Sequence, residues 1–337
     1  MAIDGDVHSG KQFRLAIAEE TTFGTAVATG WKELLVRSIS DIDFGGVVKD
    51  FEPRHAGKRV RDASDNFIQE AGSEFRMSFD CVLTDLTADL LMYGVLQNVS
   101  EAAGTPFKKD YVIDETTTQP DFSGNNGKFY TVLLHSPVTS ESYRMTSAVL
   151  ESLTINYDPG AAGGRATASG TFVSGFVIDQ STDSSGYTFT APGTDYYKPQ
   201  DITVKQINDV DVVLGGYSFT FTNGWARVGH DTTGDAETYA LTMYDMSGSM
   251  TVKYDDNTKN LVDDFLAGTT RKLEIAYGST GVDGAFFITI NNALFDGNAR
   301  DFANEMGVFL EVPFVLSQSS TTNAIDVEIS NATDRTW

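Results

Sequence analysis

Strict alternation of apolar and polar residues, repeated in many short runs, most constrains how this chain can fold. In residues 74–83 every second residue is apolar: Phe75, Met77, Phe79, Cys81 and Leu83. A period of two puts these side chains on one face of an extended strand and the polar ones on the other. Similar runs cover 149–157, 166–177, 217–223, 247–255, 271–278, 285–292 and 308–317. We therefore predict an all-β fold in which each strand has one buried and one solvent-facing side.

Two segments follow a helical period instead and predict short helices that flank the sheets. Residues 84–96 place leucines on one face after Thr84 or Asp85 as the N-cap. Residues 256–268 repeat this pattern and end on Gly268, where a glycine commonly caps a helix C-terminus. Each predicted helix directly follows a predicted strand, so the sequence contains two strand–helix units.

These two units align without a gap when the first is shifted by 175 positions. Phe75 then coincides with Met250, and Leu86 coincides with Leu261. Because apolar face matches apolar face through a strand and its helix, we predict an internal duplication. The shift is about half the chain, as two fused homologous domains would give.

The composition places the joint between the two domains at residues 179–200, which are rich in Ser, Thr, Gly and Asp. We predict a first domain over 1–178, a linker over 179–200, a second domain over 201–317 and a C-terminal tail over 318–337. Residues from about 98 to 128 are expected to be an insertion in the first domain. The tail is expected to be flexible or to clip onto a neighbouring chain.

Charge and cysteine content exclude several classes of protein. The 337 residues include 47 acids and 24 Lys or Arg, a net charge of -23. Such a chain lacks the basic excess needed to grip nucleic-acid backbone or an anionic membrane. A single cysteine, Cys81, excludes an internal disulfide and a Cys-rich zinc site. No apolar run is long enough for a transmembrane helix, so no membrane partner is expected.

A search for catalytic chemistry finds no signature. The four histidines, His8, His55, His135 and His230, are widely separated and form no metal-binding pair. Hydrolase nucleophile, phosphate-binding and dinucleotide-binding motifs are absent. Adjacent Asp residues are abundant but typical of turns and helix N-termini. We therefore predict a protein that is not an enzyme and has no cofactor and no metal site.

One short segment departs from the acidic character of the chain. Residues 53–61 contain four bases, Arg54, Lys58, Arg59 and Arg61. The simplest interpretation is a solvated loop. A sharper one is an arm that docks on an acidic surface of another copy, because an acidic protein that self-associates needs basic patches to offset repulsion.

Several blocks, taken in order, resemble the phage tail tube proteins, also called major tail proteins, in a two-domain form. The first blocks are AEETTFGTAVATGWKELLVRSIS (18–40), PRHAGKRVRDASDNF (53–67), EFRMSF (74–79) and LTDLTADLLMYGVL (83–96). The second half adds YSFTFTNGWARVG (217–229), MSGSMTVKYDDNTKNLVDDFLAG (246–268), RKLEIAYG (271–278) and ALFDGNARDFANEMGVFLEVPFVLS (293–317). No block alone is diagnostic, and the resemblance rests on their order. Residues 98–128 and 179–200 have no counterpart.

The resemblance implies duplicated tube domains, each a β-sandwich or barrel-like unit with a short flanking helix. It also implies a structural virion protein that self-assembles into stacked rings, forming the tail tube through which DNA and ejected proteins enter the host. Expected partners are further copies of the chain, the tail terminator, the tape measure protein and the baseplate or tip proteins. Genomic DNA would pass without specific binding, and assembly would occur in the host cytoplasm. Two tube domains per chain favour a trimeric ring with pseudo-sixfold symmetry, and a hexameric ring is the alternative.

If the solvent-facing sides of the duplicated strands line the lumen, alternation selects candidate lumen residues. These are Glu74, Arg76, Asp80, Lys253 and Asp255. A wall that is net negative would repel DNA phosphates and let DNA slide. The basic residues of 53–61 are then candidates for a contact between subunits or between rings.

Other functions remain open at this point. A carbohydrate-binding or adhesin β-sandwich would need clustered exposed aromatics, and Trp31, Trp225 and Trp337 are far apart in the sequence. A glycosidase needs a carboxylate pair, which any acidic β-protein offers by chance. A tail sheath, a tail terminator and a capsid decoration protein are further structural alternatives.

Overall fold

The structure is a computed structural model of the chain. It describes residues 13–43, 47–50, 66–69, 74–102, 106–113, 122, 127–138, 141–231, 235–259, 261, 267–279, 281–295, 299–301, 309–317 and 323–331. The predicted all-β fold is confirmed, and the described residues contain one complete α-helix, α1 (Asp85–Leu96). The strands of the first half are β1 (Arg14–Glu19), β2 (Trp31–Leu34), β3 (Val36–Asp43), β4 (Val47–Asp50), β5 (Asn66–Gln69), β6 (Phe75–Val82), β7 (Val99–Ala102), β8 (Phe107–Ile113), β9 (Tyr130–His135), β10 (Ser142–Tyr157), β11 (Thr167–Ser174), β12 (Asp179–Thr182) and β13 (Phe189–Thr190). Those of the second half are β14 (Ile202–Ile207), β15 (Val210–Asp211), β16 (Leu214–Val228), β17 (Thr238–Lys253), β18 (Thr270–Tyr277), β19 (Ala285–Phe295), β20 (Ala299–Asp301), β21 (Phe309–Leu316) and β22 (Ile325–Asn331).

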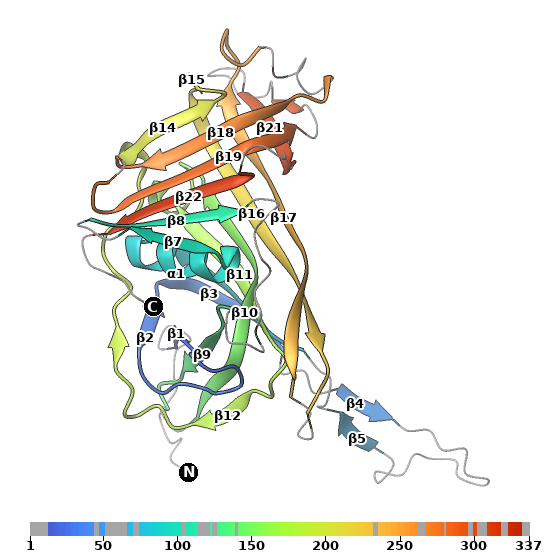
Figure 1. Ribbon diagram of the computed structural model, residues 1–337. Helices are drawn as coiled ribbons and strands as arrows, with labels where there is room; N and C mark the ends of the chain where they lie inside the picture. Colours follow the sequence, from blue (N-terminus) through green and yellow to red (C-terminus); the bar gives the residue numbers. More distant parts are fainter. Residues whose placement is uncertain are drawn as a thin grey trace, which may run out of the picture.

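One long antiparallel sheet runs through both halves of the chain, and we call it the main sheet. Its strand order is β3-β6-β11-β10-β16-β17-β21, with β20 beyond β21. The junction between the halves is the pairing of β10 with β16. In Figure 1 the β16–β17 hairpin runs along most of the length of the molecule.

A second layer of strands covers each half. In the first half its order is β2-β1-β9-β10-β12, and in the second it is β15-β14-β18-β19-β22. Strands β10 and β19 each belong to both layers of their half, since different parts of each strand pair with different neighbours. We call β1–β6 and β9–β13 with α1 the first unit, and β14–β22 the second unit.

The two units share a strand order, and irregularities in the pairing recur at corresponding places. The register between β3 and β6 shifts at Val36/Ser38, and that between β16 and β17 shifts at Leu214/Gly216. The β9–β10 register shifts next to Met145, and the β18–β19 register shifts next to Leu273. A β-bulge is a specific device that bends a strand, so matching bulges are a stronger likeness than matching alternation.

Helix α1 begins with a capping box at Thr84. The Thr84 side chain accepts a hydrogen bond from the Thr87 amide (3.2 Å), and the Thr84 amide donates to Thr87 Oγ1 (2.8 Å). The helix ends at Gln97, which adopts a left-handed backbone with φ of 61°. The helix is almost entirely buried, so it contacts the rest of the protein on all sides and not only along the predicted apolar face.

The second predicted helix, 256–268, lies partly outside the described residues. The Asp255 amide donates to Thr258 Oγ1 (2.9 Å), as the Thr84 amide does to Thr87. Leu261 is helical, and Gly268 has the left-handed φ of 63° that the sequence predicts for a C-cap. These contacts align Thr84 with Asp255 and Gln97 with Gly268, a shift of 171 positions. The shift of 175 used in the sequence alignment is therefore one helical turn too long.

Two predicted boundaries need correction. Residues 325–331 of the predicted tail form β22, whose Ile325, Val327 and Ile329 are buried between β19 and β8. The predicted linker contains β12, which pairs with β10, and β13, which pairs in parallel with β2. Both segments were missed because short alternating runs among many Ser and Thr resemble loops in composition.

The predicted insertion at 98–128 forms the β7–β8 hairpin, which belongs to the first half by sequence but joins the second unit. β8 pairs with β22 over seven residues, from Phe107 to Ile113. Figure 1 shows this hairpin lying beside α1. It therefore fastens the second unit to the helix of the first.

A single apolar cluster extends through both units. It includes Phe79 stacked on Phe172 (5.2 Å between ring centroids) in the first unit, and Phe219 edge-on to Phe314 (5.6 Å) in the second. A smaller aromatic cluster, with Phe23, Phe122 and Tyr239, packs under the far part of the β16–β17 hairpin. Burial of these rings supplies most of the driving force for folding.

The basic segment 53–61 lies outside the described residues. β4 and β5, on either side of it, pair with each other as a separate two-stranded ribbon. Figure 1 shows this ribbon projecting away from the two-layered body, beyond the end of the β16–β17 hairpin.

Candidate functional site: the polar face of the main sheet

The polar face of the main sheet is the largest surface that alternation creates. Its central strands point their apolar residues to the core, as in the buried Phe219, Phe221 and Met250. The opposite face presents hydroxyl groups in rows that cross several strands. One row is Ser169, Thr154, Thr220 and Ser247, and another is Ser78, Thr171, Ser152 and Thr222.

Neighbouring hydroxyls in these rows are bonded to each other. Ser78 Oγ lies 3.0 Å from Thr171 Oγ1, and Thr154 Oγ1 lies 2.9 Å from Thr220 Oγ1. Cross-strand Ser and Thr pairs of this kind stabilise a sheet while leaving its surface polar and uncharged. The centre of this face thus carries no group that could hold a phosphate by charge.

Charged residues lie toward the ends of the strands. Arg76 is bound to Glu151 and, at 3.2 Å, to Glu74, and these contacts raise the pKa of its guanidinium. Asp80 lies 3.4 Å from Arg37. A hollow of about 490 Å³ beside Arg76 is lined by Asp41, Ile42, Arg76, Ser78 and Thr171. Several charges on this face are therefore paired, while Lys253 on β17 and Glu311 on β21 are exposed.

The predicted lumen residues do not all lie on this face. Glu74 and Arg76 are brought together, and Lys253 is exposed at the end of β17. Asp255 lies beyond the strand, in the turn where its amide contacts Thr258. Sequence reasoning missed Glu151 and the hydroxyl rows, although Ser and Thr at alternate positions of 217–223 and 247–251 signal them.

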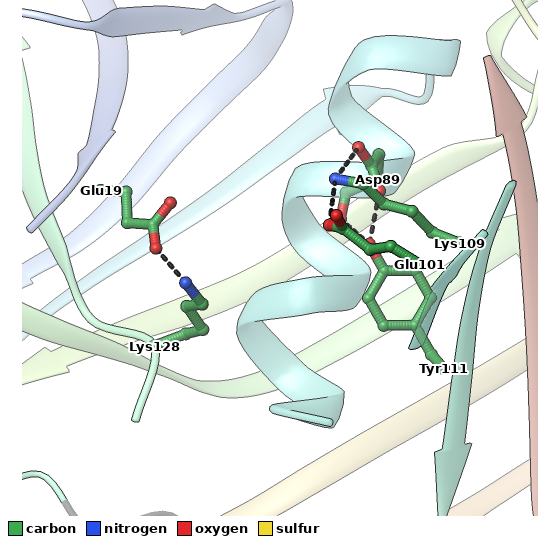
Figure 2. Close-up of polar contacts among 6 residues, drawn as sticks. All are labelled: Glu19, Asp89, Glu101, Lys109, Tyr111 and Lys128. Carbon is green, nitrogen blue, oxygen red and sulfur yellow. Dashed lines mark hydrogen bonds and ion pairs between the residues drawn. The ribbon is translucent and has the colours of Figure 1, made fainter. Parts of the chain in front are cut away.

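A buried polar network joins α1 to the β7–β8 hairpin (Figure 2). Asp89, fully buried on α1, accepts hydrogen bonds from the Tyr111 hydroxyl and from Lys109 Nζ (3.3 Å), and Lys109 also reaches Glu101 (3.5 Å). Burial, together with the charge of Asp89, holds the pKa of Tyr111 well above its usual range. These groups satisfy each other in the interior, so the network is a structural fastening.

A second buried carboxylate lies where the chain leaves β1. Glu20 is 3% exposed and accepts hydrogen bonds from Thr131 Oγ1 (2.6 Å), the Ser147 amide (2.9 Å) and Ser147 Oγ (2.7 Å). Burial raises the pKa of this carboxyl despite these hydrogen bonds. Glu20 thus ties β9 and β10 to the loop that carries Phe23.

The described residues offer little for catalysis. No group of three or more His, Cys, Asp or Glu among them could hold a metal ion. Cys81 is fully buried, which raises the pKa of its thiol to about 12. Within the described part of the chain, no helix has the length and apolar character needed to cross a membrane.

The two described tryptophans are packing residues. Trp31 is fully buried and stacks on Tyr187 (5.4 Å between centroids). Trp225 packs edge-on against Phe122 (4.9 Å) and donates from Nε1 to the Leu150 carbonyl (3.2 Å). Trp337 lies outside the described residues. Neither described indole is available for an exposed aromatic platform.

A main sheet with a polar, largely uncharged face, built on a single continuous core, defines a structural β-protein. The comparison with protein families identifies it further. The chain matches the family model of the phage tail tube proteins over residues 10–316, and it belongs to this family. Its role is accordingly structural, as a component of the virion tail. No curated protein matches the chain.

Proposed function

We propose that this protein is the subunit of a tail tube: it self-assembles into rings that stack into a hollow conduit for DNA and ejected proteins. The observation that supports this most is the main sheet, whose two ends, β3 and β20, each have one partner strand among the described pairings. An open sheet edge in a soluble protein invites pairing with another chain. Pairing these ends around a ring would turn each main sheet into part of a closed wall.

Each chain contributes two tube domains to the ring. The shared strand order and the matching bulges of the first and second units support an internal duplication. A chain with two equivalent units forms a pseudo-sixfold ring from three copies. A hexameric ring, with one unit in the wall and one outside, is the alternative.

The polar face of the main sheet forms the lumen wall. Its hydroxyl rows would let DNA pass without charge attraction, and the net charge of -23 would oppose binding of phosphate. The sequence predicts a wall that is net negative. Among the described residues of this face, Asp80 and Glu151 are paired with arginines and Glu311 is exposed, so the wall would be uncharged at its centre and carry mixed charge near the strand ends.

Introducing positive charge on the proposed lumen face tests this assignment. Thr220→Lys places an ammonium in the middle of a hydroxyl row, and Asp80→Lys repeats the change at the rim. Thr188→Lys, at an exposed position before β13, is the matched control. Tubes should form in all three, and DNA ejection should be slower in the first two only. Normal ejection from tubes that carry either lumen variant would contradict the assignment.

The basic residues Arg54, Lys58, Arg59 and Arg61 belong to an arm that contacts a neighbouring subunit or the adjacent ring. The projecting β4–β5 ribbon, which flanks them in sequence, supports this role. Changing all four to Ser should leave rings intact and shorten or abolish stacked tubes in electron micrographs. Stacking equal to that of the wild type would contradict the role.

The remaining partners follow from a place in the tail. The terminator and the baseplate or tip proteins would cap the two ends of the tube, and the tape measure protein would occupy its lumen before ejection. Assembly would take place in the host cytoplasm. An adhesin-like role is less well supported, because Trp31 is buried in the core and Trp225 is half-buried and packed edge-on against Phe122.

A further inference from the structure

The junction between the two units is a template for the contact between two chains. In it, Ser152–Tyr157 at the end of β10 pair antiparallel with Tyr217–Thr222 of β16, in unbroken register. This pairing joins the main-sheet strands of the first unit to those of the second. The β10–β16 pairing therefore shows how the sheet edge of one unit pairs with the sheet edge of the other.

The corresponding segments at the two ends of the main sheet are β20 and β3. β20 pairs with β21 as the end of β10 pairs with β11, with the same one-residue register shift just before it. β3 pairs with β6 as β16 pairs with β17, again with a matching shift at the start. β20 thus takes the place of the end of β10, and β3 takes the place of β16.

We infer that β20 of one chain pairs antiparallel with β3 of the next, reproducing the β10–β16 junction between chains. The correspondence sets the register: Asn156 pairs with Ser218 within the chain, so Asp301 should lie opposite Ser40. Arg300 then lies opposite Asp41 and Ile42, where β3 is bulged and Asp41 has φ of 50°. This inference rests on the proposed ring assembly and names the surfaces that make it.

The two kinds of junction differ in the outer layer. Within the chain, the β7–β8 hairpin leaves the first unit after α1 and adds to β22 of the second unit. In the second unit, only Gly268 and Thr269 separate the helical Ala267 from β18, so no hairpin exists to reach the next chain. We call the pairing of the β7–β8 hairpin with β22 the clasp. It is present at the junction within each chain and not at the junction between chains, so the ring has threefold and only pseudo-sixfold symmetry.

Cysteine cross-linking tests the strand pair and its register. Ser40→Cys with Asp301→Cys should give disulfide-linked chains on oxidation of the assembled protein, since opposed strand residues are within disulfide reach. Both substitutions lie on end strands of the main sheet, each with one partner strand in the described part of the chain, and Ser40 is exposed. The matched control is Ser38→Cys with Asp301→Cys, displaced by two residues along β3, where the distance is too large. Cys81 is buried and remains unreactive.

The expected result on a non-reducing gel is a series of linked species that ends at three chains, with loss of all linked species in the control. Single cysteine variants should give no series. If rings form by electron microscopy but Ser40 and Asp301 do not link, or the control links as well, this inference is wrong and the ring proposal stands. If the wild-type chain forms no rings, the ring proposal and this inference are both wrong.

Discussion

At the scale of single residues, the buried carboxylate of Glu20 gives a pH-dependent contribution to stability. Because burial raises its pKa in the folded state, the folded protein binds this proton more tightly than the unfolded chain. Its contribution to stability is fully present below the unfolded-state pKa and is lost as the pH rises through the folded-state pKa. Stability measured against Glu20→Gln should therefore decrease as the pH rises above the unfolded-state pKa of about 4.3.

Thermal unfolding of the wild type and of Glu20→Gln at a series of increasing pH values measures this difference in stability directly. The Gln side chain retains an acceptor for Thr131 and the Ser147 amide, so Glu20→Gln should fold normally. Glu20→Ala leaves those donors unpaired and should cost about 1–3 kcal/mol at low pH, where the Glu20 contribution is fully present. If the free energy of unfolding of the wild type, relative to that of Glu20→Gln, increased with pH, this role of Glu20 would be contradicted.

Asp89 provides a second test at this scale. Asp89→Ala removes the carboxylate that lies 3.3 Å from the Lys109 ammonium, whose side chain is 4% exposed, and leaves the Lys109–Glu101 contact at 3.5 Å. Removing one partner of a buried ion pair costs about 3–5 kcal/mol. Asp256→Ala, in an exposed pair with Lys259, should cost less than about 1 kcal/mol. Denaturant unfolding measures the loss in free energy of unfolding for both variants. Equal losses would show that the buried network of Asp89 does not stabilise the contact between α1 and the β7–β8 hairpin.

At the scale of elements, close packing of strands in the main sheet depends on glycine at Gly248. A Cβ built there would lie 2.3 Å from the Ser218 carbonyl oxygen on the paired strand. Since the obstacle is backbone, Gly248→Ala must displace β17 from β16, and we expect a loss of about 1–3 kcal/mol. Gly186→Ala, with open space around it, should be neutral. Equal unfolding midpoints for both variants would contradict this packing.

The strands could be predicted from the sequence because their alternation is strong, as in β6 and β18. The number of positions that separates the two strand–helix units could not be determined in the same way. A shift of 175 or of 171 positions preserves the strand faces, because the difference is even, and nearly preserves the helix face, because four residues are close to one turn. Only the capping contacts of Thr84 and Asp255 and the bulges distinguish them. β22 and the hydroxyl rows were missed because Ser and Thr are typical of both loops and solvent-facing strand positions.

At the scale of the whole molecule, one chain presents two complementary sheet edges separated by two similar units. Three such chains close into a ring when the rotations at the β10–β16 junction and at the interchain junction together make one third of a turn, and the six units are equivalent when the two rotations are equal. Deleting the clasp, by replacing residues 99–113 with a short Gly-Ser linker, should weaken the contact between units without removing either edge. We expect a lower unfolding midpoint with ring size unchanged, measured by calorimetry and negative-stain microscopy. A change in ring size would show that the clasp sets the angle between the units.

The central claim is that each ring contains three chains whose six units are nearly equivalent. Cryo-electron microscopy of tubes assembled from the purified full-length chain tests this most directly. We expect a hollow tube with a continuous inner β-wall, threefold rings with pseudo-sixfold inner symmetry, and three outer ridges from the β7–β8 hairpins. Rings of six chains, or an inner wall made from only one of the two units, would contradict it.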